Sequence, residues 1–295
     1  MDDRFTLTDF LNQYSDNDKC LEEIENTRWP NGIECAKCKK VTNHYKIKGR
    51  MQYACANCGT HIAPLAGTIF EKSVTPLTSW FYAMFLMINT RAGVSAKTLQ
   101  RELGVTYKTA WRMFHQIRKL MADDTFTFSD GVVEIDETYI GGKPRKHERW
   151  DTKKKEAVMG MVQRDGKVFL KHVEGTGKWA VLEQVKNHIK PDVRVITDEW
   201  PSYTQLKKHG YTHDVILHKK TYVQKDIHTQ NIENVWSHLK RCIYGVYRHV
   251  SKKHLQAYAD EFAFRYNNRK NIYTMFQILL RQIPSIRMIA VRQLA

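Results

Sequence analysis

The sequence predicts a multidomain protein, in which a small cysteine-rich module and a helical module precede an α/β domain whose mixed sheet is flanked by helices. Three observations lead to this fold class. Two Cys-x-x-Cys pairs lie before residue 60, apolar residues recur at helical spacing between residues 76 and 122, and strand and helix patterns alternate from residue 132. The 295 residues, 42% of them hydrophobic, suffice for two or three folded units.

The character of the sequence changes near residues 26, 64 and 128, without an internal repeat or a low-complexity tract. The first part has apolar residues at helical spacing around a polar break and carries no pattern of a catalytic or binding site. The predicted parts are a helical segment over 1–25, the cysteine-rich module over 26–63, the helical module over 64–127, and the α/β domain with C-terminal helices over 128–295.

The charge balance favours a polyanionic partner. Lys and Arg number 47 against 31 Asp and Glu, which gives a net charge of +16. A strongly basic protein attracts phosphate backbones, so nucleic acid is the expected partner. A soluble basic protein without such a partner is the alternative.

We expect neither secretion nor membrane insertion for this chain. Asp2, Asp3 and Asp9 occupy the place where a secretory signal has a basic start and an apolar run. The most apolar stretch, residues 80–88, is about half as long as a bilayer-crossing helix. We therefore expect a cytoplasmic protein that is associated with the nucleoid when it is bound to DNA, with no membrane partner.

The two cysteine pairs predict a zinc site. Cys35 and Cys38 form the first pair, Cys55 and Cys58 form the second, and sixteen residues separate the two pairs. Each pair presents two sulfurs from a tight turn, and a hairpin between the pairs would bring all four around one tetrahedral ion. Because four thiolates leave no open position, the predicted zinc is structural and the module is a zinc ribbon. Four unrelated buried cysteines and a redox pair are the alternatives.

The second half of the helical module is typical of a helix-turn-helix. Gly104 and Val105 make a turn between two amphipathic patterns, and Thr106 is placed to cap the helix that follows. We interpret residues 107–121 as a recognition helix. Any helical hairpin with a glycine turn gives the same pattern, so a purely structural role is the alternative.

Three residues of the predicted recognition helix are expected to contact DNA. Tyr107, Lys108 and Arg112 lie near its start and off its apolar stripe. Residues in this part of a recognition helix face the major groove. The expected ligand is double-stranded DNA.

Two aspartates lie on strands of the predicted α/β domain. Asp136 is within an apolar strand, and Asp198 directly follows a later buried strand. Between them the sequence predicts a hairpin turned at Asp165–Gly166 and a helix over 178–190. Functional groups of mixed sheets tend to gather at the ends of strands, which makes Asp198 a candidate for a site.

A third carboxylate lies on a predicted helix over 230–243. Its apolar stripe is expected to pack on the sheet, and Glu233 is off that stripe. At about 100° per residue, Glu233 and Lys240 fall on the same edge of the helix, two turns apart. Both are expected to face one cleft.

Two strand-borne aspartates and one helix-borne glutamate provide what two-metal phosphoryl transfer requires. Carboxylate oxygens are hard ligands that hold two divalent ions roughly 3.5 to 4 Å apart. One ion would activate the attacking water or DNA 3′-hydroxyl, and the other would stabilise the departing 3′-oxygen. Each carboxylate alone is as consistent with a solvated surface group, but the three together favour a catalytic site.

The stretches around these carboxylates resemble the motifs of insertion-sequence transposases. The likeness is to DDE transposases that carry an N-terminal zinc ribbon, and it covers nearly the whole chain. The matching stretches are residues 134–143, 196–200 and 228–240, and residues 261–269 resemble the closing helix motif of the family.

The resemblance implies an RNase H-like catalytic fold and a reaction on the terminal inverted repeats of a mobile element. It assigns Asp136, Asp198 and Glu233 to the acidic triad and Lys240 to the basic residue that follows it. Two Mg²⁺ or Mn²⁺ ions would then be the catalytic cofactors, beside the one structural Zn²⁺. The partners would be double-stranded DNA, as element ends and target, and further copies of the chain on that DNA. His228 precedes Glu233 in its motif and is expected near the metals.

A basic loop follows the Asp136 strand. Residues 143–155 hold seven Lys or Arg against two acids, beginning with Lys143, Arg145 and Lys146. These side chains are expected to bind the phosphate backbone beside the active site, and a solvated charged loop is the alternative.

Two other functions share part of this pattern. A junction-resolving nuclease with an RNase H-like fold would have the carboxylates without needing both DNA-binding modules. A transposase-derived regulator would bind DNA without catalysis, and the intact triad counts against it.

Overall fold

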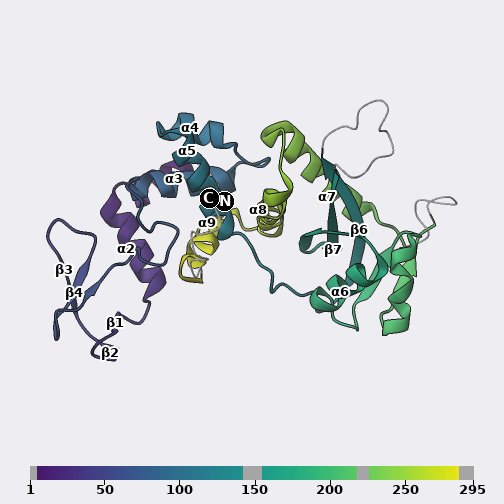
Figure 1. Cartoon of the computed structure of the whole chain (residues 1–295), viewed down its shortest axis with the longest axis horizontal. Coiled ribbons are helices and arrows are strands. Elements are labelled where there is room, and N and C mark those ends of the chain that lie inside the picture. Colours follow the sequence, from purple (N-terminus) through teal and green to yellow (C-terminus); the bar gives the residue numbers. More distant parts are fainter. Residues whose placement is uncertain (1–4, 142–154, 218–225, 286–295) are drawn as a thin grey trace. The chain divides into compact units, whose positions relative to one another are not determined.

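The computed structural model describes residues 5–141, 155–217 and 226–285 (Figure 1). The chain divides into two compact units. Unit 1 comprises Met1–Thr90, Ala96–Met121 and Asn271–Ala295, and unit 2 comprises Arg91–Ser95 and Ala122–Lys270.

Unit 1 contains six α-helices within the described residues. The polar break predicted in the first segment separates two of them, because Asp16 accepts a hydrogen bond from the Lys19 backbone N–H and thereby begins a new helix. The helices are α1 (Leu7–Gln13), α2 (Asn17–Arg28), α3 (Leu77–Asn89), α4 (Ala96–Leu103), α5 (Tyr107–Lys119) and α9 (Ile272–Arg281).

The core of unit 1 is rich in aromatic rings and includes the last helix of the chain. Phe276 of α9 is fully buried, with its ring centroid 5.4 Å from Tyr14 and 5.5 Å from Phe5. The predicted boundaries placed all C-terminal helices in the α/β domain. The structure differs for α9, since these long-range ring contacts place it in unit 1.

The cysteine-rich part of unit 1 is built from very short strands. Strands β1 (Glu34–Cys35) and β2 (Lys40–Val41) form one antiparallel pair. A three-stranded antiparallel sheet contains β3 (His44–Lys46), β4 (Tyr53–Cys55) and β5 (His61–Ile62). The hairpin predicted between the cysteine pairs is the β3–β4 hairpin.

Unit 2 is organised around a mixed five-stranded sheet in the order β10-β9-β6-β7-β8. β6, β7 and β8 are antiparallel neighbours, whereas β9 and β10 continue the sheet from β6 as parallel strands. The strands are β6 (Val132–Gly141), β7 (Lys155–Gln163), β8 (Val168–Val173), β9 (Arg194–Thr197) and β10 (His213–Val215).

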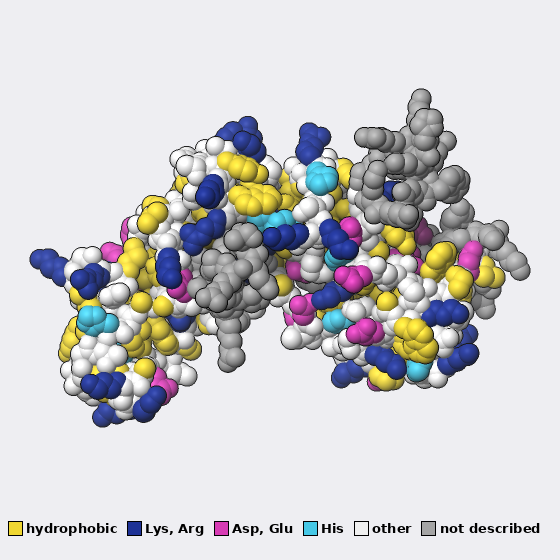
Figure 2. Space-filling model, in the orientation of Figure 1, with side chains coloured by type: hydrophobic (Ala, Val, Ile, Leu, Met, Phe, Trp, Pro, Cys, Tyr) yellow, Lys and Arg dark blue, Asp and Glu magenta, His cyan; other side chains and the backbone are white. Residues whose placement is uncertain are grey.

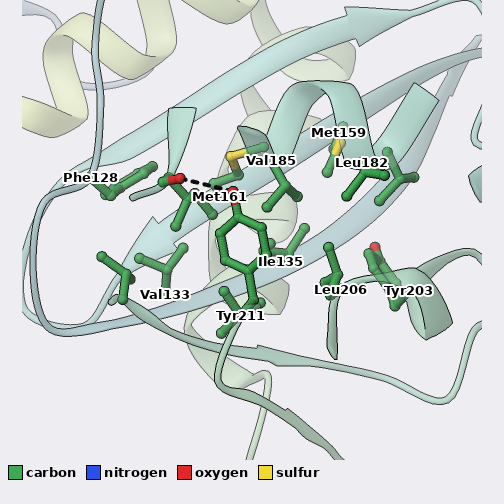
Figure 3. Packing of buried hydrophobic residues seen from close by; sticks show 14 of the residues in the cluster. Phe128, Val133, Ile135, Met159, Met161, Leu182, Val185, Tyr203, Leu206 and Tyr211 are labelled. Carbon is green, nitrogen blue, oxygen red and sulfur yellow. Dashed lines mark hydrogen bonds between the residues drawn. The ribbon is translucent and has the colours of Figure 1, made fainter. Parts of the chain in front are cut away.

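One face of this sheet carries a core with α6 (Lys178–His188). Val133 and Ile135 of β6 pack there with Val185 of α6, as Figure 3 shows. Tyr211 closes the cluster, and its hydroxyl donates a 3.2 Å hydrogen bond to the Ile189 carbonyl. Two 3-10 segments, Pro201–Gln205 and Lys207–His209, follow Asp198.

The opposite face carries a second core with α7 (Gln230–Arg241) and α8 (Leu255–Asn267). Ile140, Val158 and Val162 of the sheet pack there against Trp236 and Leu239 of α7. The predicted helix over 230–243 ends as α-helix at Arg241 and continues as a π-helical turn, Cys242–Tyr247. Two further 3-10 turns lie at Lys252–His254 and Ile283–Ser285.

The apolar stretch of residues 80–88 lies within α3, where Trp80, Phe81 and Met84 are fully buried. Within the described parts of the chain, no helix combines the length and the apolar character that crossing a membrane requires.

Candidate active site and metal centre

Asp136 and Asp198 come from neighbouring parallel strands at the same level of the sheet. The last paired residues of β6 and β9 are Glu134 and Ile196. Asp136 lies two residues further along β6, and Asp198 lies two residues after Ile196, directly beyond the end of β9. The strand register thus brings to one level two aspartates that are 62 positions apart in sequence.

Asp136 is held in place by α7. Trp236 Nε1 donates a 2.8 Å hydrogen bond to Asp136 Oδ2. Burial, and then the negative charges of Asp198 and Glu233, raises the pKa of Asp136 to about 6, although the hydrogen bond from Trp236 opposes this rise. The negative charges of Asp198 and Glu233 thus act on Asp136.

Glu233 lies in the first turn of α7 on its exposed side. The stripe of Ile232, Val235, Trp236 and Leu239 is buried, so Glu233 is off the apolar face as predicted. Thr229 Oγ1 donates a 3.2 Å hydrogen bond to Glu233 Oε1. The charge of this carboxylate contributes to the raised pKa of Asp136.

Gly160 of β7 lets α7 approach the sheet. Gly160 is paired with Asp136 across the β6–β7 ladder. A methyl group on Gly160 would overlap the Trp236 ring and lie 2.8 Å from Ile232 Cδ1. A side chain there would displace the helix that carries Glu233.

Asp198 is oriented by the backbone that follows it. The Trp200 N–H donates a 2.9 Å hydrogen bond to Asp198 Oδ1. The strand end before it is fixed by buried Thr197, whose hydroxyl lies 2.9 Å from His213 Nε2. Burial lowers the pKa of His213 to about 4, so this imidazole is neutral at neutral pH.

Glu137 is a fourth carboxyl group near the site that the sequence interpretation missed. It forms a hydrogen bond with the buried Tyr203 hydroxyl. Burial raises the pKa of Glu137 to about 7, and the charges of Asp136 and Asp198 contribute to the rise. An acidic residue next to Asp136 in an apolar strand was the available signal.

Glu134 is a second buried carboxylate beside the site that the sequence interpretation missed. It is fully buried two residues before Asp136, and it contacts Arg164 and the start of α7. Its presence inside the apolar run Val132–Ile135 was the signal, because a buried glutamate requires partners.

The remaining predicted residues of this site are only partly placed. Lys240 lies on α7, two turns after Glu233, and is partly exposed. His228 lies before α7, with Nδ1 3.4 Å from Glu134 Oε1. Lys143, Arg145 and Lys146 lie outside the described residues.

The three carboxylates fit a divalent cation chemically. Asp136, Asp198 and Glu233 offer hard oxygen donors, the type that Mg²⁺ and Mn²⁺ prefer. Burial is the main cause of the raised pKa of Asp136, and the charges of Asp198 and Glu233 add to it; a bound cation would offset these charges.

The four cysteines of unit 1 are brought together as the spacing predicted. Their Sγ atoms all lie within 4.8 Å of one another. The Cys35–Cys58 and Cys38–Cys55 sulfurs are 3.5 and 3.9 Å apart, close to the roughly 3.8 Å edge of a tetrahedron with zinc–sulfur bonds of about 2.3 Å.

The two cysteine turns have the same local structure. The residue after each turn, Lys39 with φ 53° and Gly59 with φ 72°, has left-handed backbone. Each donates its N–H to the carbonyl of the first cysteine of its pair, at 2.8 and 2.9 Å. The Thr42 hydroxyl lies 3.2 Å from Cys55 Sγ, and this hydrogen bond lowers the pKa of the Cys55 thiol to about 6.

Helices α4 and α5 are joined by the predicted turn over Gly104–Thr106. Thr106 caps α5 as predicted, accepting a 3.2 Å hydrogen bond from the Thr109 N–H. Tyr107, Lys108 and Arg112 are exposed, and Arg112 also donates a 3.0 Å hydrogen bond to the Glu71 carbonyl. Figure 2 shows basic side chains beside hydrophobic ones over these helices.

Comparison with known families finds a match for the cysteine-rich part of the chain and another for the domain that contains the three carboxylates. Residues 129–267 match the ISXO2-like transposase domain, and residues 15–61 match the transposase zinc-ribbon domain. The chain carries both of these transposase domains. The predicted resemblance to insertion-sequence transposases with a zinc ribbon is thereby confirmed.

Two relatives of the transposase agree with this assignment. A protein of Halobacterium salinarum described as an uncharacterized protein in transposable element ISH50 is 27% identical over 81% of this chain and 86% of its own length. An uncharacterized transposase-like protein of Haemophilus influenzae is 28% identical over 35% of this chain and 82% of its own length.

The two matched regions of the transposase contain both ligand sets. All four cysteines lie within the zinc-ribbon match, and Asp136, Asp198 and Glu233 lie within the domain match. Helices α4 and α5 lie between the matched regions, so their role depends on geometry alone.

Proposed function

We propose that this transposase binds the terminal inverted repeats of an insertion sequence and cleaves and joins DNA strands with Asp136, Asp198 and Glu233. The observation that carries the proposal is the placement of the three carboxylates: the strand register sets Asp136 and Asp198 at one level, and Glu233 lies on the exposed edge of α7. Burial raises the pKa of Asp136, and the charges of Asp198 and Glu233 add to this rise, which supports a common role.

The residues of the site would divide the work of phosphoryl transfer. Asp136, Asp198 and Glu233 hold the cofactor, and Trp236 and the Trp200 backbone N–H fix the orientation of the two aspartates. Two bound Mg²⁺ or Mn²⁺ ions supply the positive charge that activates the attacking hydroxyl group and stabilises the departing 3′-oxygen. Lys240, on the same helix as Glu233, would bind a DNA phosphate beside the site.

We infer that unit 2 is an RNase H-like domain. A mixed sheet with helices on both faces, an aspartate within the central strand β6 and another directly after the neighbouring strand β9 supports this inference.

We infer that α4 and α5 form a helix-turn-helix that holds DNA. The short turn, the cap by Thr106 and the exposure of Tyr107, Lys108 and Arg112 support this role. The zinc ribbon, with one structural Zn²⁺, and the basic residues Lys143, Arg145 and Lys146 would add phosphate contacts, and the chain would act as a homo-oligomer on DNA.

Nicking of a labelled element-end fragment with Mn²⁺ tests the catalytic proposal. Asp136→Asn and Asp198→Asn keep the shape of each side chain but remove an anionic ligand, so strand cleavage is expected to fall roughly a hundredfold or more. DNA binding by both variants should persist. Cleavage at the wild-type rate by either variant would contradict the assignment, and wild-type protein that binds but never cleaves would indicate a regulator.

Binding measurements test the role of α5. Lys108→Ala and Arg112→Ala are each expected to weaken binding to end DNA, by about 1–3 kcal/mol if the side chain contacts a base. Lys108 is the cleaner site, since Arg112 also contacts the Glu71 carbonyl. An equal loss on random DNA would indicate a phosphate contact, and no loss for either variant would exclude this helix from the interface.

A further inference from the structure

Glu134 is a fully buried carboxylate at the start of α7. Its Oε2 accepts hydrogen bonds from the backbone N–H groups of Asn231 and Ile232, at 2.9 and 3.2 Å. Its Oε1 accepts a 2.8 Å hydrogen bond from Asn231 Nδ2. A residue of β6 thus accepts hydrogen bonds from N–H groups in the first turn of a helix that lies 97 residues away in sequence.

Arg164 completes this cluster. Its Nε donates a 3.0 Å hydrogen bond to Glu134 Oε1, and its Nη2 donates a 3.2 Å hydrogen bond to the His228 carbonyl. The Arg164 backbone N–H donates to the Val132 carbonyl of β6 at 3.0 Å. Arg164 therefore connects the strand that carries Asp136 with the segment that leads into α7.

Helix α7 depends on Glu134 for its N-terminal cap. The first N–H groups of an α-helix have no partner within the helix, and a side chain just before it usually accepts them. The residue at that position, Thr229, makes no such cap. The Glu134 carboxylate accepts these N–H groups instead, where the positive end of the helix dipole favours a negative charge.

We propose that Glu134 is a positioning residue for the catalytic carboxylates, with Arg164 as its partner; this rests on the proposed metal-dependent function. Glu134 lies two residues before Asp136 on β6, and the N–H groups that it binds belong to the two residues that precede Glu233 on α7. The same contact therefore fixes the strand ligand and the helix ligand relative to each other.

A purely stabilising buried ion pair would make a different prediction. Losing it would lower the unfolding temperature without changing the affinity of the folded protein for metal. Partners that orient metal ligands, in contrast, typically change metal affinity by about 10- to 100-fold. Metal affinity therefore separates the two roles.

The test compares Glu134→Gln with the wild type and with Glu156→Gln in the full-length protein. Glu156 is a matched control, because it is a glutamate of the adjacent strand β7 whose carboxylate lies 3.0 Å from His172 Nε2 and 3.4 Å from Lys252 Nζ. Mn²⁺ binding is measured by electron paramagnetic resonance of the free ion, and amide hydrogen exchange is measured for residues 229–236.

Glu134→Gln places an amide N–H₂ among N–H donors, so it loses at least one hydrogen bond to α7. The Mn²⁺ concentration for half-saturation is expected to rise about tenfold or more, and exchange at the start of α7 is expected to quicken. Glu156→Gln should change neither. Saturating Mn²⁺ should restore much of the cleavage by Glu134→Gln but none by Asp136→Asn.

Unchanged Mn²⁺ affinity in a folded Glu134→Gln protein would overturn the proposal, even if the unfolding temperature fell. If that variant does not fold, Arg164→Lys, which retains the charge but loses the contact to His228, should show a smaller shift in the same direction, and no shift would overturn the proposal. Wild-type protein that neither binds Mn²⁺ nor cleaves DNA would refute the proposed function instead, while hydrogen exchange would still report whether Glu134 holds α7.

Discussion

In the zinc ribbon the four cysteines take the place of a core, whereas in unit 2 a core on each face of the sheet carries the proposed carboxylate ligands. Between residues 30 and 63, all of which the structure describes, Cys35 and Cys55 are the only buried residues. Asp136, in contrast, lies on a ten-residue strand with an apolar cluster on either side. Ligands should therefore be essential for folding in the ribbon and unfavourable for stability in the sheet.

Loss of the ribbon ligands tests the first half of this contrast and has the largest expected effect. A Cys38→Ser, Cys58→Ser double variant should lose zinc and unfold the ribbon, because thiolate ligation of zinc contributes on the order of 10 kcal/mol in small modules. Zinc content and amide exchange of residues 34–62 are the measurements. The control is Cys242→Ala in unit 2, and one zinc per chain in the double variant would contradict the prediction.

Removing a ligand from the sheet tests the second half. Without metal, the Asp136→Asn variant should unfold at the wild-type temperature or higher. The substitution removes a buried negative charge that is close to the charges of Asp198 and Glu233, and the asparagine oxygen can still accept the hydrogen bond from Trp236. The cleavage rate should nevertheless fall about a hundredfold or more, which corresponds to an activation barrier that is higher by at least about 2.7 kcal/mol. Calorimetry of the metal-free protein decides, and a clearly lower unfolding temperature would assign Asp136 a structural role.

Gly160→Ala should lower both stability and cleavage, whereas Asp136→Asn should lower cleavage alone. The added methyl group would displace Trp236 and Ile232, so about 1–3 kcal/mol of stability should be lost together with cleavage. Gly175→Ala is a matched control, because a Cβ there has no neighbour within 4 Å. Denaturant unfolding and the nicking assay measure both quantities, and full cleavage by Gly160→Ala would show that α7 tolerates displacement.

Asp260 on α8 extends the comparison to a carboxyl group outside the proposed site whose ionisation is opposed by burial. Burial raises the pKa of Asp260 to about 7, although a 2.7 Å hydrogen bond from Gln256 opposes this. The folded chain thus holds a proton that the unfolded chain releases near pH 4, so this contribution to stability is complete below about pH 4 and is lost as pH rises through 7.

Replacing this carboxyl should remove that pH dependence. Asp260→Asn should gain roughly 1–2 kcal/mol relative to the wild type between pH 5 and pH 8. Urea unfolding at the two pH values measures the difference. A constant difference between wild type and variant across this range would show that Asp260 titrates normally.

The sequence predicted the ribbon site completely because all of its ligands follow local rules. Each Cys-x-x-Cys turn fixes its own two sulfurs, and only one hairpin has to form to join them. The proposed triad could be singled out in the same way, since an aspartate inside an apolar strand and a glutamate off a helical stripe are anomalies within single elements, and its catalytic role stays a prediction.

Contacts between distant elements could not be predicted in the same way. The cap of α7 by Glu134, the space left by Gly160 and the pairing of Glu137 with Tyr203 all depend on which strands and helices become neighbours. The sequence gives no periodic signal for such pairs. The return of α9 to unit 1 was missed for this reason, because the rings around Phe276 come from residues more than 190 positions earlier.

The burial of Phe276 among Phe5, Tyr14 and Phe81 has a consequence for biosynthesis. At roughly 5–20 residues per second, a ribosome needs about 8–30 s to proceed from the end of α5 to the end of α9. During that time the N-terminal helices have emerged but lack a ring of their core, while unit 2 is complete in sequence before α9 appears. The nascent chain should therefore finish the transposase domain first and close its N-terminal unit last.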